Sequence, residues 1–151
     1  MYSREELKQL KKAFWEGFGD YASMLPELKH RKSKFVLYNT KVKGVELKFD
    51  ANREGAFVIL EINHKVQAER ERLYAHFERY KVILEEEFPE KLIWRPEFRR
   101  ESGEMVARIY TQKPNIDIHR QAQWKDFYPF MAEEMMKLER AFLTLKDTLE
   151  G

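Results

Sequence analysis

Residues 45–62 read VELKFDANREGAFVILEI, and this stretch decides the fold class. In its first half, apolar and charged residues alternate, which is typical of a β-strand because successive side chains point to opposite faces of a sheet. Residues 57–60 in its second half are all apolar, as expected for a central strand that is covered on both faces. The turn-forming residues 52–55 between the halves predict a hairpin with a four-residue connection.

The alternation also predicts the register of this hairpin. Placing the apolar residues of both strands on one face pairs Val45 with Ile62. The alternation of side chains then fixes every other pair between this one and the turn. The remaining apolar pairs are Leu47 with Leu60 and Phe49 with Val58. On the opposite face, the same register sets Glu46 directly across from Glu61.

Three segments outside the hairpin show the three- and four-residue spacing of an amphipathic helix. The first begins at a capping box formed by Ser3 and Glu6. The second covers about residues 66–88, and the third covers about residues 121–149. Pro129 lies inside the third segment and is expected to mark a kink or a restart.

Three more short runs are rich in β-branched and aromatic residues and predict further strands. Residues 35–40 complete a three-stranded meander with the hairpin, and residues 91–98 and 104–111 form a second hairpin. Pro96 indicates an edge or a bulge in this second hairpin. The expected order is α-β-β-β-α-β-β-α, a single α+β domain over residues 1–151 whose antiparallel sheet is packed by three helices.

Composition excludes several classes of protein. The chain has 151 residues and no cysteine, which excludes thiolate zinc sites and cysteine nucleophiles and favours a reducing, cytoplasmic setting. No run approaches the roughly 18 apolar residues of a membrane span, so no membrane partner is expected. Glycine-rich phosphate-binding motifs are also missing, and we therefore expect no nucleotide cofactor and no other cofactor.

The paired carboxylates predict a metal site. Two carboxylates across a strand pair repel each other unless a cation lies between them, and oxygen clusters of this kind hold Mg²⁺. The order helix, three strands, helix, strand is similar to the core of the PD-(D/E)xK nuclease-like fold, where two acids and a lysine hold Mg²⁺ and orient a water. That resemblance implies a divergent Mg²⁺-dependent nuclease with Glu46 and Glu61 as metal ligands and, together with Lys65, as catalytic residues. Asn63 stands where the nuclease pattern has its lysine. The alternative interpretation is that Glu46 and Glu61 line a solvated sheet face alongside Lys48 and Lys65.

His64 directly follows this strand and allows two interpretations. It lies close enough in sequence to act as a base together with Glu61. A histidine at the end of a strand more often forms a hydrogen bond with a helix N-terminus or a carboxylate, and we favour this structural role.

Positive charge is concentrated in residues 29–48. This stretch carries seven basic residues and one acidic residue, so its charge is +6, whereas the whole chain carries only +2. The basic residues are Lys29, Arg31, Lys32, Lys34, Lys41, Lys43 and Lys48. Such a patch is typical of proteins that bind the phosphate backbone, so DNA or RNA is the expected partner. Four arginines of the second predicted hairpin extend the patch if the hairpins lie side by side: Arg95, Arg99, Arg100 and Arg108. A solvated loop and sheet edge is the alternative.

Several short motifs are distributed over nearly all predicted elements. They are Phe14-Trp15 with Phe18, Lys48-Phe49-Asp50-Ala51, Glu61-Ile62-Asn63-His64-Lys65, Trp94 with Pro96, and Arg108-Ile109-Tyr110. Through them the chain, from about residue 3 to residue 149, resembles the bacterial family numbered 4268 among domains of unknown function. Members of that family sometimes follow a nuclease-like module, so the resemblance implies an accessory role near nucleic acid. It supplies no catalytic or binding residues.

The last helical segment carries more large apolar residues than one buried stripe uses. They are Trp124, Phe127, Tyr128, Phe130 and Met131. Exposed apolar patches commonly mark partner surfaces, so a homodimer is expected. Taken together, the sequence predicts a non-catalytic binding or interaction module associated with nucleic acid. A nuclease and a structural dimerisation domain are the alternatives.

Overall fold

The computed structural model describes residues 2–26 and 40–149, which form an antiparallel sheet packed by helices. In chain order the elements are α1 (Arg4–Ser23), β1 (Val45–Asn52), β2 (Gly55–Ile62), α2 (Gln67–Arg79), α3 (Lys81–Leu84), β3 (Ile93–Arg99), β4 (Met105–Pro114), the 3₁₀ turn η1 (Gln121–Gln123) and α4 (Trp124–Leu149). The expected α+β class is therefore confirmed.

The sheet has the strand order β1-β2-β4-β3, and β2 is central as expected. Its register with β1 is the predicted one, with Val45 opposite Ile62 and Glu46 opposite Glu61. The expected four-residue connection is too long, because Asn52 still pairs with Gly55 and only two residues form the turn. Gly55 has a φ of 146°, and a Cβ at this position would lie 2.1 Å from the carbonyl oxygen of Lys113 in β4. Glycine at position 55 thus allows β1 and β2 to pair as far as Asn52 and Gly55 while β4 lies close beside them.

The second hairpin has the irregularity that Pro96 predicts. β3 is an edge strand, and its pairing with β4 shifts between Arg95 and Phe98, which lie opposite Arg108 and Val106. Pro96 lies inside that shift, where its missing N–H costs no ladder hydrogen bond.

The expected meander needs correction. Residues 35–39 of its first strand lie outside the described residues, and Thr40 belongs to no strand. Its hydroxyl donates to the carbonyl of Val45 (2.6 Å), which holds a turn just before β1 begins. The described sheet consequently has four strands and not five.

The expected helix over residues 66–88 is also wrong in detail, because it divides at Tyr80 into α2 and the short α3. The stripe of apolar residues continues across Tyr80, so the spacing of these residues does not reveal the break. The break redirects the chain so that Leu84 and Phe88 are buried while Val82 remains 85% exposed. The described residues therefore contain four α-helices and not three.

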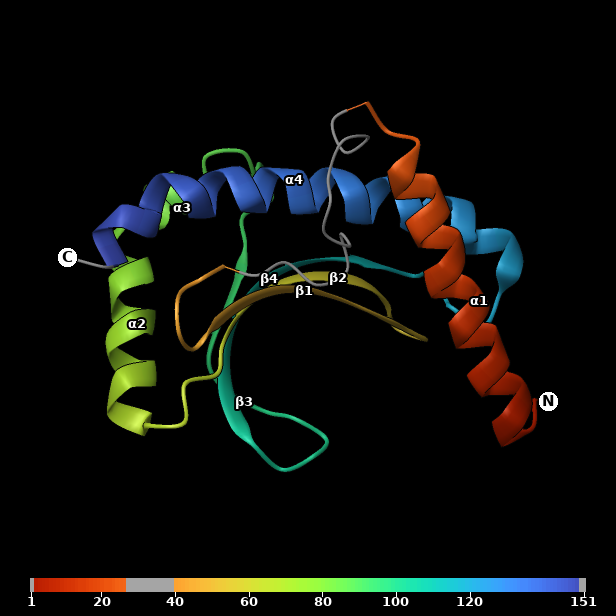
Figure 1. Ribbon diagram of the computed structural model, residues 1–151, viewed down its shortest axis with the longest axis horizontal. Helices are drawn as coiled ribbons and strands as arrows, with labels where there is room; N and C mark the ends of the chain where they lie inside the picture. Colours follow the sequence, from red (N-terminus) through yellow and green to blue (C-terminus); the bar gives the residue numbers. More distant parts are fainter. Residues whose placement is uncertain (1, 27–39, 150–151) are drawn as a thin grey trace.

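Figure 1 shows α4 lying along one face of the sheet, with α1 near one of its ends and α2 and α3 near the other. The core lies between this face and the helices, and it includes Phe18 of α1, Phe49 of β1 and Met135 of α4. Pro129 lies within α4 without interrupting it, so no restart occurs there. None of the described helices combines the length and apolar character that crossing a membrane requires.

Candidate functional site

The polar face of the sheet, turned away from α4, carries the paired carboxylates. Glu46 and Glu61 lie opposite each other on β1 and β2, as the alternation predicts. Their environments differ, because Glu46 is exposed whereas Glu61 is 0% exposed. A buried carboxylate is costly unless it is paired and hydrogen-bonded, so its neighbours decide what it can do.

Three cationic side chains surround Glu61. Lys48 Nζ, from β1, lies 2.8 Å from Oε2, and Arg108 Nε, from β4, lies 3.0 Å from Oε1. Arg100, which follows β3, donates to both carboxylate oxygens through Nη2 and Nε. Asn63 Nδ2 donates a further hydrogen bond to Oε2 (3.3 Å). Four structural segments thus converge on one buried carboxylate, which we call the Glu61 cluster: Lys48, Glu61, Asn63, Arg100 and Arg108.

This environment keeps Glu61 ionised. Burial by itself raises its pKa, but hydrogen bonds from Arg100 and Lys48, together with their positive charges, outweigh burial and lower the pKa from 4.5 to about 2. The same contact raises the pKa of Arg100, chiefly through its hydrogen bond to Glu61. Glu61 and Arg100 therefore carry opposite charges across the whole physiological pH range.

Aromatic side chains position the arginines on this face. The guanidinium of Arg108 lies over the ring of Phe98, with its Cζ 4.0 Å from the ring centroid. Arg95 Nε donates to the hydroxyl of Tyr110 on the neighbouring strand (3.3 Å). Arg108 is thus held from two sides, by a carboxylate and by a ring.

The cations leave Glu61 little capacity to bind a metal. Lys48 pairs directly with Glu61, whereas Lys65, the lysine of the nuclease hypothesis, is exposed beyond the end of β2. Within residues 2–26 and 40–149, no group of three or more histidine, cysteine, aspartate or glutamate side chains could hold a metal ion. The observed contacts of Glu61 are those of a buried carboxylate that fixes the positions of Lys48, Arg100 and Arg108.

The predicted basic residues fall into three sets. Lys29, Arg31, Lys32 and Lys34 lie outside the described residues. Lys41 and Lys43 are exposed just before β1, and Lys48 belongs to the Glu61 cluster. The structure therefore brings Lys48 together with Arg100 and Arg108 from the second hairpin.

His64 has the structural role that we favoured. Its Nδ1 accepts a hydrogen bond from the backbone N–H of Val66 (3.1 Å), the residue immediately before α2. The backbone carbonyl of His64 accepts a hydrogen bond from Arg70 Nη1 in α2 (2.9 Å). His64 thus stabilises the start of α2.

The aromatic residues that suggested a dimer are used largely within the chain. Trp124, Phe127 and Met131 are buried, and the Tyr128 hydroxyl donates to the carbonyl of Phe14 (2.8 Å). The homodimer remains a prediction.

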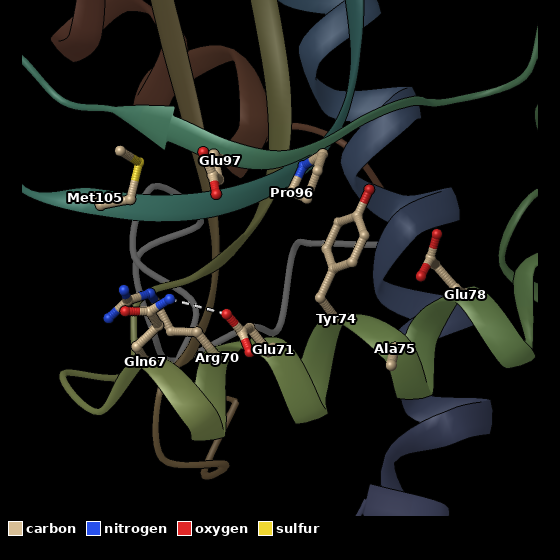
Figure 2. A pocket seen from close by; sticks show the side chains of 9 residues that line it. All are labelled: Gln67, Arg70, Glu71, Tyr74, Ala75, Glu78, Pro96, Glu97 and Met105. Atoms are coloured by element: carbon tan, nitrogen blue, oxygen red, sulfur yellow. Dashed lines mark hydrogen bonds between the residues drawn. The ribbon is translucent and has the colours of Figure 1, made fainter.

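A second feature is a groove of about 410 Å³ between α2 and the β3–β4 hairpin. Figure 2 shows one face of α2, including Gln67, Glu71 and Tyr74, directed towards Pro96 and Glu97 of the hairpin. Gln67 donates to Glu71 within α2 (2.9 Å). Burial and the nearby negative charge of Glu78 raise the pKa of Tyr74, so its hydroxyl remains protonated.

The low pKa of Glu61 predicts a specific dependence of stability on pH. A folded-state pKa below the ordinary value contributes stability that is present above about pH 4.5 and is lost as the pH falls towards 2. Urea unfolding at pH 6, 4.5, 3.5 and 2.5 should therefore show a loss of stability that is smaller in Glu61→Gln than in the wild type. Glu90→Gln, an exposed site, is the control for changed net charge and should follow the wild type. Parallel pH profiles for the wild type and Glu61→Gln would contradict the expectation.

Comparison with known proteins identifies one family. A family model described as "Domain of unknown function (DUF4268)" matches residues 10–146. No curated protein matches the chain, and no solved structure matches it.

Proposed function

The chain belongs to the DUF4268 family, a domain of unknown function, and we propose that it is a non-catalytic module that binds the phosphate backbone of nucleic acid. The Glu61 cluster is the observation that supports this proposal. Three cations surround one buried carboxylate, and the exposed Glu46 and Glu104 offset the two remaining positive charges, with Glu104 paired to Arg100 (3.4 Å). The polar face of the sheet thus carries three cationic side chains that Glu61 holds in fixed positions.

The arginines of the cluster retain hydrogen-bonding capacity for a ligand. A guanidinium has five N–H donors; Glu61 accepts one hydrogen bond from Arg108 and two from Arg100, and Glu104 accepts a third from Arg100. The side chains of Arg100 and Arg108 are 24% and 13% exposed, so solvent reaches both. Because Glu61 and the ring of Phe98 hold these groups in place, binding a phosphate costs less side-chain entropy than it would for free arginines.

Exposed lysines extend the positive charge beyond the cluster. Lys41 and Lys43 lie just before β1, the strand that carries Lys48. Together with the basic residues at 29–34, they account for the charge of +6 over residues 29–48. Proteins that neutralise several phosphates bind nucleic acid without sequence preference and with strong salt dependence.

We expect Lys41→Glu/Lys43→Glu to weaken binding of a fluorescein-labelled 20-base-pair DNA by about tenfold or more at ~50 mM salt, because it reverses two charges beside the proposed surface. The slope of log Kd against log[salt] should become shallower by an amount that corresponds to about two phosphate contacts. Fluorescence anisotropy across a salt series measures both quantities. Lys8→Glu/Lys12→Glu is the matched control, since these exposed lysines lie on α1 and give the same net charge.

Two outcomes would contradict this function. If the wild type shows no binding at low salt, or if both double variants weaken it equally, the polar face is not the binding surface. Cleavage of the DNA in Mg²⁺ that is abolished by Glu61→Gln would establish the nuclease alternative instead.

A further inference from the structure

The sheet has an open edge at the end of β4. β3 pairs with β4 only as far as Ile93 and Tyr110, whereas β4 continues through residues 111–114 in register with β2. Among the described residues, no strand pairs with the other edge of residues 111–114. Alternate residues of a strand direct their backbone groups to opposite neighbours, so this edge presents backbone hydrogen-bonding groups.

The start of β3 is fixed, which keeps this edge open. Lys91 has a φ of 67°, a left-handed conformation that directs the preceding chain away from the sheet. The buried Glu85 holds the next residues, because its Oε2 accepts from the backbone N–H of Leu92 (2.9 Å) and from the indole N–H of Trp94 (3.0 Å). β3 therefore cannot extend along β4 without losing these contacts.

A cavity of about 510 Å³ lies beside the open edge. Its walls are residues 111–115, the segment 88–91, and Phe130, Glu134 and Lys137 on one face of α4. Binding cavities for small ligands have volumes of roughly 300–1,000 Å³. At about 3.3 Å per residue, a strand matching residues 111–114 is about 13 Å long. The cavity thus has room for a segment of a few residues.

One polar atom in the cavity wall lacks a hydrogen-bond partner. Glu134 Oε1 accepts from Lys137 Nζ (3.2 Å), whereas Oε2 is buried and accepts no hydrogen bond. A buried acceptor without a donor costs free energy. The terminal torsion of a glutamate is soft, so the carboxylate of Glu134, which lines the cavity, can rotate to present this oxygen to a ligand there.

We propose that an extended peptide binds in this cavity, adds a short strand to β4 at residues 111–114, and directs an arginine or lysine side chain to Glu134. A peptide strand supplies the backbone donors and acceptors that the open edge lacks, and this mode of recognition is common at sheet edges. A cationic side chain supplies the donor that Glu134 Oε2 lacks. This site lies on α4 and the end of β4, so it is independent of the proposed nucleic-acid surface.

A peptide series tests the proposal. The probes are acetylated, amidated heptapeptides of alternating threonine and valine, whose central residue is arginine, lysine, glutamate or alanine. Titrated into ¹⁵N-labelled protein, the arginine and lysine peptides should shift the backbone amides of residues 111–113 and bind about tenfold more tightly than the alanine peptide. The glutamate peptide should bind most weakly.

Variants separate the two parts of the proposal. Glu134→Gln should remove the preference for the cationic peptides, whereas Glu133→Gln, an exposed neighbour on α4, should retain it. N-methylation of alternate residues of the arginine peptide removes the N–H groups that face β4 and should abolish binding. The proposal is overturned if no peptide shifts these amides at millimolar concentration, if the N-methylated peptide binds equally well, or if single-stranded dT₁₀ and not a peptide causes the shifts.

Discussion

Glu61→Ala is expected to lower the free energy of unfolding by about 3 kcal/mol, because removing one partner of a buried ion pair leaves the others uncompensated. The side chains of Lys48, Arg100 and Arg108 are 26%, 24% and 13% exposed in the native structure, so water cannot fully replace the lost carboxylate. Their partial exposure places the effect at the lower end of the roughly 3–5 kcal/mol typical of such changes. Urea denaturation followed by circular dichroism at pH 7 measures it.

Glu46→Ala is the matched control for this substitution. Glu46 lies directly opposite Glu61 in the sheet, but it is exposed, so its loss should change the free energy of unfolding by no more than about 0.5 kcal/mol. Equal effects of the two substitutions would mean that the Glu61 cluster does not stabilise the fold. The interpretation of the polar face as a fixed arrangement of cations would then fail as well.

Phe14→Ala is expected to destabilise the protein by about 3–5 kcal/mol, since truncating a buried aromatic ring leaves a cavity. Phe14 is 0% exposed and connects α1 to α4. Its ring centroid lies 5.3 Å from that of Trp124 and 5.2 Å from that of Phe127, both in edge-to-face geometry. Thermal and urea unfolding measure the loss, and the near-ultraviolet circular dichroism of Trp124 should change as its neighbour disappears.

Tyr2→Ala provides the comparison for this core substitution. Tyr2 is an aromatic residue just before the same helix, but it is 50% exposed, so its truncation should cost less than about 1 kcal/mol. If Phe14→Ala cost no more than Tyr2→Ala, the packing of α1 against α4 would not contribute to the stability of the domain.

Local patterns in the sequence predict the elements whose determinants are close together in the chain. The alternation through Val45 and Ile62 predicts the register of the first hairpin, since a slip by one residue would move every apolar side chain to the polar face. Ser3 caps α1 as expected, because its hydroxyl accepts from the backbone N–H of Glu6 three residues later (3.1 Å). Pro96 marks the irregular edge strand because it lacks an N–H.

Features that depend on distant residues escape such patterns. The spacing of Phe77, Tyr80 and Leu84 continues across the break between α2 and α3, because packing against α4, and not helix periodicity, decides where that chain turns. Gly17 carries no turn signal, yet a Cβ there would lie 2.5 Å from the hydroxyl of Tyr128 in α4. Its small size permits the close approach of two helices that are far apart in sequence.

The sequence by itself determined that Glu46 and Glu61 lie opposite each other, since side-chain parity in a hairpin is a local property. Only the tertiary structure decided what surrounds Glu61. The strand order β1-β2-β4-β3 places β4 beside β2 and thus brings in Arg108 and Arg100, which are 47 and 39 residues away. That order follows from burying the apolar faces of β1, β2 and β4 against α4, a requirement of the whole chain that no single segment encodes.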